Sequence, residues 1–356
     1  MENLLWFLLA FLLCLIIKML FIKPGATPTP SGAIIMAIGI FLYSAMQHLT
    51  RLYAYGELLA FVLAAVWSLI VLSIFRTLLD KTFHKLYLKN PINVFAIGTW
   101  VAGTSVLGNV IHQFSLNLGV FPYVMGTLNV ILFIWYIYHC FRAFPAIIHS
   151  SAKNKVHGVL LLATVSTQSI VLLLYNIFNH LLPTYGSTIV ISFGILVYIA
   201  GFILILRRFV FIRNWNLADD WNNTNCILHG AISITGLASA TTASMPASII
   251  LLLWIWALFW FILIEAIEFC RVIDRIREYG IREAIFKYDV SQWSRNFTFG
   301  MLYAFTAKFS LAEESVLQPI RSAILMVGPW IVFIFLVYEI ILFFKDNATI
   351  GSLRKA

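Results

Sequence analysis

The feature that most constrains this chain is a succession of apolar runs about 20 residues long, the length at which a helix crosses a bilayer. The runs occupy residues 3–22, 31–50, 56–76, 92–112, 121–143, 157–179, 187–207, 225–244, 246–269, 290–310 and 321–344. Charged residues make up only 11% of the 356 positions, whereas soluble domains carry about 25%. The sequence therefore predicts an all-α, multi-pass membrane protein.

The basic residues predict how the chain is oriented. If every run crosses the membrane, all but three of the 24 Lys and Arg fall on one side, and the exceptions are Arg51, Lys308 and Arg321. Basic residues in short loops stay in the cytoplasm. We therefore expect a cytoplasmic C-terminus and an outside N-terminus. Because the net charge of +9 sits in these loops, we expect no nucleic-acid partner.

The chain divides into three parts. Residues 1–27 form an extra N-terminal transmembrane helix and a linker, set apart by Pro24, Pro28 and Pro30. Residues 28–344 form a ten-helix pore domain, and residues 345–356 form a cytoplasmic tail. A signal peptide is the alternative for the first run. It has no basic residue ahead of it and no clear small-x-small cleavage site, so we expect it to be retained.

Composition alternates along the ten helices of the pore domain. The odd-numbered helices, counted from the run at 31–50, are rich in Gly, Ala, Ser, Thr, Asn and Gln, and the even-numbered helices are bulky and apolar. Small residues let helices pack closely in lipid, which is one explanation. Polar side chains at membrane depth also need partners or water. The pattern favours five helical hairpins in two concentric rings, with the odd helices around a central pore.

Helical spacing selects candidate lining residues, because positions three and four apart share a face. The candidate faces contain Gly98, Ala102, Ser105, Asn109, Thr164, Gln168, Ser233, Gly236, Tyr303 and Thr306. Phe299 is a bulky ring on the corresponding face of the ninth helix and is the candidate gate. Phe297 lies about 200° around that helix from Phe299, so at most one of them blocks the channel.

The charges of these faces suggest what passes. They carry no Asp or Glu, although a proton-coupled carrier usually has an ionisable relay at membrane depth. Three basic residues, Arg213, Arg295 and Lys287, are candidates for a positive pore mouth that concentrates anions. Their alternative role is to set the topology. The uncharged faces favour passive conduction over coupled transport. The expectation that small monovalent anions pass rests mostly on the resemblance described below. The alternative is a proton-coupled exporter of organic acids or oxyanions such as sulfite, tellurite or dicarboxylates.

The sequence shows no residue pattern that favours an enzyme. Glu265 and Glu268 lie three residues apart, but we expect them to form ion pairs with Arg271 or neighbouring arginines rather than to act as acid and base. The four cysteines have no paired spacing, which argues against a metal site. We therefore expect neither an enzyme nor a cofactor.

Three segments resemble a known family. They are PTPSGAIIMAIGIFLYS at 28–44, YLKNPINVFAIGT at 87–99 and WSRNFTFGMLYAFT at 293–306. They resemble the tellurite-resistance/dicarboxylate transporter family, which includes the slow-type anion channels of plant guard cells, over about residues 28–344. The resemblance implies a pore formed by the odd helices, an aromatic plug that matches Phe299, and a homotrimer with one pore per subunit.

Two departures from the family pattern stand out. The run at 3–22 is extra, and the prolines that kink several inner helices of relatives are mostly missing. Gly98, Gly103, Gly236 and Gly300 are candidates for the bends instead. The short loops and the lack of long regulatory tails suggest a bacterial inner membrane.

Overall fold

The computed structural model describes residues 2–22, 25–114, 116, 118–178, 181–211 and 215–347, and every regular element within them is a helix. The long helices are α1 (Glu2–Phe21), α2 (Gly32–Tyr43), α4 (Gly56–Leu79), α6 (Gly98–Gln113), α7 (Phe121–Ile148), α8 (Leu162–Ile177), α9 (Thr184–Phe211), α11 (Ile227–Thr242), α12 (Ala247–Ile285), α13 (Gln292–Lys308) and α14 (Gln318–Asn347). The shorter elements are η1 (Thr29–Ser31), η2 (Ala45–His48), α3 (Thr50–Tyr53), η3 (His84–Leu88), α5 (Pro91–Ala96), η4 (Ser151–Lys155), η5 (Gly158–Leu161), α10 (Leu217–Asp220) and η6 (Asn223–Cys226). A long helix occupies each predicted run, which confirms the all-α, multi-pass fold.

Five of these helices, α2, α6, α8, α11 and α13, pack into a closed ring. α2 packs on α6, α6 on α8, α8 on α11, α11 on α13, and α13 on α2 again. These are the odd-numbered helices of the sequence, and their surfaces are mostly covered: the described window of the α5–α6 span is 100% buried. Small residues allow this close approach. A side chain at Gly103, for example, would meet the Gly32 carbonyl oxygen at 2.9 Å.

The bulky helices α4, α7, α9, α12 and α14 cover the outside of the ring. Each contacts two consecutive ring helices: α4 lies over α2 and α6, α7 over α6 and α8, α9 over α8 and α11, α12 over α11 and α13, and α14 over α13 and α2. Only 22–33% of their most apolar windows is buried. The outer faces present large apolar side chains, the arrangement expected of helices in contact with lipid.

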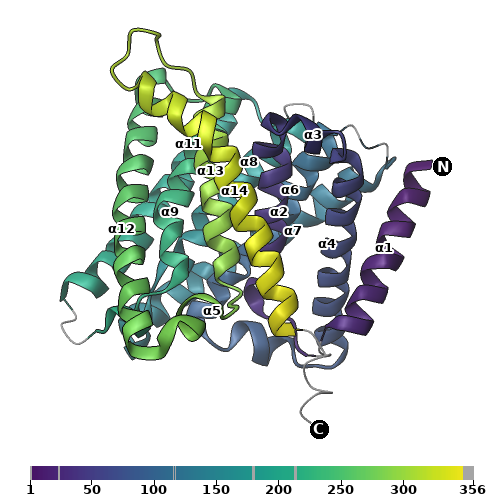
Figure 1. Ribbon diagram of the computed structural model, residues 1–356, viewed down its shortest axis with the longest axis horizontal. Helices are drawn as coiled ribbons and strands as arrows, with labels where there is room; N and C mark the ends of the chain where they lie inside the picture. Colours follow the sequence, from purple (N-terminus) through teal and green to yellow (C-terminus); the bar gives the residue numbers. More distant parts are fainter. Residues whose placement is uncertain are drawn as a thin grey trace.

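Helix α1 stands apart from both rings. In Figure 1 it lies at the right-hand edge, beside α4, which is its main partner. Its apolar window is only 6% buried. Lys18 Nζ of α1 donates a hydrogen bond to Ser73 Oγ of α4 at 2.6 Å. The helix therefore contacts the rest of the molecule mainly through α4.

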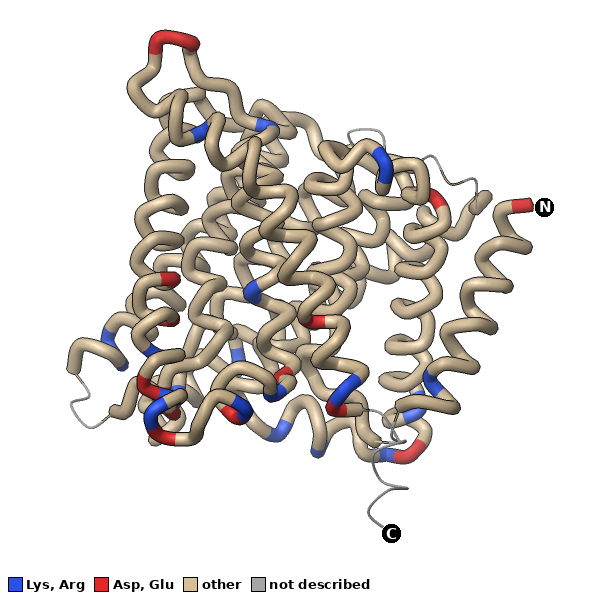
Figure 2. Tube along the Cα trace, viewed as in Figure 1, with Lys and Arg blue, Asp and Glu red and all other residues tan. Residues whose placement is uncertain are grey.

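Charge separates the two ends of the bundle. Figure 2 shows most Lys and Arg at the lower end of the view, which we call the basic end. Every ring helix begins at this end (Figure 1), and three of the five are entered through the short segments η1, η5 and η6. Asn90 caps the entry to α5 by accepting a hydrogen bond from the Ile92 amide at 3.0 Å. The start of α1 and the end of α14 lie at opposite ends of the molecule (Figure 1).

Candidate functional site

A small cavity lies on the axis of the ring, and all five ring helices contribute to its wall. Its volume is about 10 Å³, close to the smallest space that holds one water molecule. Its lining residues are Ile40, Tyr43, Val106, Asn109, Ser169, Leu172, Ile234, Leu237 and Met301. None of them carries a charge, and three are polar. They lie from the middle of the ring helices towards the end opposite the basic end, since each ring helix begins at the basic end (Figure 1).

Helix α6 places one predicted lining residue on the cavity. Asn109 lines it and accepts a hydrogen bond from Asn176 Nδ2 at 3.0 Å. Ala102 lies two helical turns earlier on the same face. Ser105 instead accepts a hydrogen bond from Asn129 Nδ2 of the outer helix α7 at 2.9 Å. A side chain at Gly98 would collide with α7 and α8. The cavity face of α6 thus lies to one side of the predicted face.

Helix α8 is rotated further from the prediction. Thr164 donates a hydrogen bond to the Gly194 carbonyl oxygen at 3.1 Å, and Gln168 Nε2 donates to the Ile191 carbonyl oxygen at 3.2 Å. Both acceptors belong to the outer helix α9. The α8 residues that reach the cavity are Ser169, next to Gln168 in sequence, and Leu172. The predicted face of α8 is therefore its contact surface with α9.

Helix α11 shows a similar offset. Ser233 donates to its own helix, at the His229 carbonyl oxygen, over 2.8 Å. Gly236 packs against the ring of Phe305 on α13, so a side chain there would collide with that ring. Neither residue is among those that line the cavity. The small residue at position 236 serves close packing between two ring helices.

The two predicted lining residues on α13 do not line the cavity and form polar contacts with other elements. The Tyr303 hydroxyl lies 2.7 Å from His48 Nδ1 in η2. Thr306 accepts a hydrogen bond from Trp254 Nε1 of α12 at 3.0 Å. The first contact joins α13 to the end of the α2 span, and the second joins it to the outer helix α12.

The candidate gate, Phe299, lies on the same outer side of α13. Its ring contacts Phe261 of α12 at a centroid distance of 5.0 Å and Phe335 of α14 at 5.2 Å. Met301, which lines the cavity, is two residues away and therefore about 200° around the helix. Phe297 is four residues before Met301, shares its face, and is 1% exposed. Phe297 is therefore a second aromatic candidate for the gate, besides Phe299.

The predicted pore-mouth charges are not freely available where the structure describes them. Lys287 is exposed and pairs with Glu283 at 3.0 Å. Arg295 pairs with Glu265 and, at 3.6 Å, with Glu268, both on α12. Arg213 lies outside the described residues. These pairs reduce the positive field that the side chains of Lys287 and Arg295 would otherwise present.

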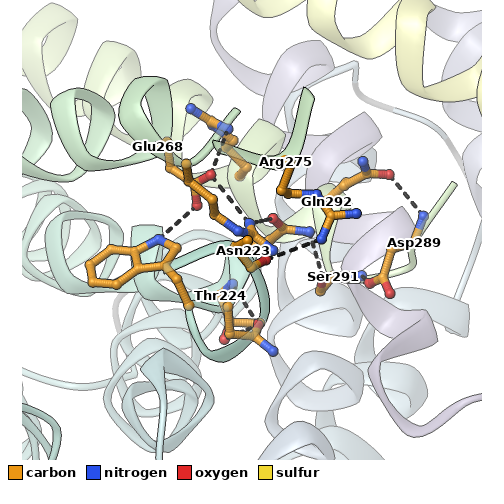
Figure 3. Close-up of polar contacts among 12 residues, drawn as sticks. Asn223, Thr224, Glu268, Arg275, Asp289, Ser291 and Gln292 are labelled. Carbon is orange, nitrogen blue, oxygen red and sulfur yellow. Dashed lines mark hydrogen bonds and ion pairs between the residues drawn. The ribbon is translucent and has the colours of Figure 1, made fainter. Parts of the chain in front are cut away.

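A polar cluster surrounds Glu268 near the basic end (Figure 3). Its carboxylate accepts a hydrogen bond from Trp221 Nε1 at 2.9 Å and pairs with Arg271 at 3.3 Å, which confirms the predicted ion pair. Arg271 donates to Asn223 Oδ1 at 2.6 Å, and Asn223 Nδ2 donates to Ser291 Oγ at 3.0 Å. The cluster ties the entrances of α11 and α13 to α12.

Most hydroxyl groups of the ring helices donate their hydrogen bonds to carbonyl oxygens of their own helix. Ser166, Ser169, Ser233, Thr235 and Ser239 each donate to the carbonyl oxygen four residues earlier, at 2.7–2.8 Å. Such bonds need neither a partner helix nor water. Hydroxyl content therefore identifies the buried helices but not the face that lines the cavity.

Comparison with known families places the chain. The sequence profile of the SLAC1 family, described as voltage-dependent anion channels, matches residues 22–344. The chain belongs to this family, which includes the tellurite-resistance/dicarboxylate transporters, so the resemblance seen in the sequence is confirmed. The match begins after α1. A comparison with curated proteins finds no match. The protein is therefore an integral membrane protein of an anion channel and transporter family.

Proposed function

We propose that the chain conducts small monovalent anions passively along the axis of the ring. The observation that carries this proposal is the cavity on that axis, whose described lining residues are uncharged. A wall without a tight binding group suits conduction, because an ion that binds strongly leaves slowly. We also carry forward from the family resemblance a homotrimer in which each subunit has its own path.

The preference for anions is supported by the direction of the ring helices. All five begin at the basic end, so the positive ends of their dipoles face that entrance. The excess of Lys and Arg there adds a longer-range attraction. We infer that the basic end is cytoplasmic, with the C-terminus inside, the N-terminus outside, and a bacterial inner membrane as the location.

The gate in this proposal is Phe297 together with Met301. Phe297 lies one helical turn closer to the basic end than Met301, on the same face of α13. Apolar constrictions of this kind close a pore by excluding water. Rotation of the Phe297 ring away from the axis would open a continuous path. The alternative gate, Phe299, would have to leave its contacts with Phe261 and Phe335.

Paired alanine variants test the gate. Phe297→Ala is expected to raise anion current on the order of tenfold, equivalent to ~1.4 kcal/mol off the barrier. Phe299→Ala is the matched control, because it removes an equal ring from the outer side of the same helix, and it is expected to leave current unchanged. The measurement is current in planar bilayers at equal protein density, with reversal potentials across an anion series. A rise with Phe299→Ala alone would restore the prediction made from sequence.

One observation favours the alternative of proton-coupled transport. Glu339 in α14 is 5% exposed, and its Oε1 has no hydrogen-bond partner among the described residues. Buried carboxylates at membrane depth often carry protons. Anion flux into liposomes, with and without a proton gradient, separates the two functions. The channel predicts flux independent of the gradient in wild type and Glu339→Gln. Gradient-driven accumulation that Glu339→Gln abolishes would establish coupling.

A further inference from the structure

A second cavity opens at the basic end, between the ends of two outer helices. Its volume is about 160 Å³, and it lies between the end of α7, the segment η4 and the last turns of α9. Ile148, Leu204 and Phe211 form its apolar wall. Lys153 and Arg207 stand at its rim. The cavity lies outside the ring and has no part in the path proposed above.

The rim is built around a fixed arginine. Arg208 lines the cavity and is 6% exposed, because it donates to the Val156 carbonyl oxygen at 2.6 Å and to the Asp220 carbonyl oxygen at 3.0 Å. It also pairs with the Asp220 carboxylate at 3.7 Å. These bonds hold η4 and the end of α9 in place. The position of the cavity is therefore set by the fold rather than by the exposed side chains around it.

Two cations at this rim lack an acidic partner. Lys153 and Arg207 are exposed, and neither forms an ion pair with any residue that the structure describes. Other basic residues at the same end are paired, for example Arg76 with Asp80 at 3.6 Å. Unpaired cations beside a cavity are suited to an anionic ligand. The amide of Asn154, which also lines the cavity, adds a hydrogen-bond donor.

The apolar wall points to a ligand with a hydrocarbon part. Phe211 is 76% exposed and Ile148 is 41% exposed at the mouth of the cavity. Towards the middle of the membrane, α9 continues the apolar surface with Ile203, which is 55% exposed. A cavity with cations at headgroup depth and an apolar strip leading into the bilayer matches the two parts of a phospholipid.

We propose that this cavity binds one anionic phospholipid. Lys153 and Arg207 hold its phosphate, and an acyl chain lies along Leu204, Phe211 and Ile203. Basic pockets between membrane helices bind anionic headgroups by this combination of charge and apolar contact. The lipid would link η4 to α9 and thereby support the entrance to α8.

The test is lipid retention by the purified full-length chain in detergent micelles, measured by native mass spectrometry during titration with phosphatidylglycerol or phosphatidylcholine. Wild type is expected to retain one phosphatidylglycerol per chain in preference to phosphatidylcholine. The double variant Lys153→Gln/Arg207→Gln is expected to lose about tenfold or more of that affinity. Lys85→Gln/Lys89→Gln is the matched control, because it removes two positive charges from the same end and is expected to bind as wild type.

Two further arms decide the source of the phosphate. Phe211→Ser is expected to weaken phosphatidylglycerol binding, because it shortens the apolar wall and leaves both cations in place. If Phe211→Ser binds normally and millimolar inorganic phosphate displaces the lipid, the site takes a free oxyanion and the lipid proposal is overturned. An equal loss in the Lys85/Lys89 control would also overturn it, since binding would then depend only on net charge.

Discussion

Adjacent helices α8 and α9 show how differently the two rings use their residues. The window of α8 is 89% buried and that of α9 only 28%. α8 carries Thr164 and Gln168, which donate to backbone carbonyls of α9. Among the described residues, no side chain of α9 forms a hydrogen bond to α8. The outer face of α9 exposes Ile189, Leu196 and Ile203. Polar groups in the ring thus serve helix packing as well as the axis.

The same comparison explains why polarity alone is an ambiguous signal. An amide in a membrane helix needs a partner, and the nearest one is often the backbone of the covering helix. Gln168 takes that partner, whereas Ser169, one residue later, bonds within its own helix and faces the cavity. The more polar side chain of the two therefore points away from the axis.

The strongest test of the contact between the rings is removal of Arg295. Its guanidinium joins ring helix α13 to Glu265 and Glu268 of outer helix α12. Arg295→Gln leaves two carboxylates without this partner in a largely buried site, and we expect a loss of roughly 3–5 kcal/mol in the free energy of unfolding. The measurement is thermal unfolding of the purified chain in detergent micelles.

Lys287→Gln is the control for that variant. Lys287 pairs with Glu283 on the exposed surface, with side chains 62% and 54% exposed. Exposed pairs contribute about 0–1 kcal/mol, so the unfolding temperature should hardly change. Equal effects of the two variants would mean that the α12–α13 contact does not depend on Arg295.

A smaller loss in the free energy of unfolding is expected when a glycine of the inner or the outer helix ring is replaced by alanine. Gly158 donates its amide to Asn225 Oδ1 at 2.9 Å, and a Cβ at this position would collide with the Thr224 backbone. Gly158→Ala should therefore destabilise the chain by about 2–3 kcal/mol. Gly186, near the start of the outer helix α9, has no atom closer than 3.5 Å to an added Cβ.

Gly186→Ala is accordingly expected to be neutral or to stabilise α9 by up to ~1 kcal/mol, because Ala has the higher helix propensity. Both variants are compared by unfolding under identical conditions. If Gly158→Ala were as mild as Gly186→Ala, the close approach of η5 and η6 at the entrance to the ring would be in doubt.

The sequence predicts the architecture well and the site poorly. Hydropathy and the distribution of Lys and Arg depend on the membrane, which acts on whole helices, so the eleven runs and the odd–even alternation emerge from composition. Rotation of each helix about its own axis depends on a few contacts. Tyr303 and Thr306 face away from the axis, where they form hydrogen bonds with His48 and Trp254. Those two partners are remote from them in sequence.

The aromatic candidate illustrates the same limit. Phe297 and Phe299 are equally bulky, and the spacing excludes only that both face the axis. What separates them is a pair of rings, Phe261 and Phe335, on two outer helices. A signal was present in the sequence, since Met301 shares a face with Phe297, but it becomes useful only when the cavity is known.

The most direct test of the central claim is cysteine accessibility at two adjacent positions of α8. Ser169→Cys and Gln168→Cys are made in a background where the exposed Cys270 is replaced by Ser. A negatively charged, water-soluble thiol reagent is then added from the side opposite the basic end while anion current is recorded. The account predicts that current through Ser169→Cys falls and that Gln168→Cys is unaffected, because α9 covers it. Block of Gln168→Cys with no effect on Ser169→Cys would contradict a path along the axis of the ring.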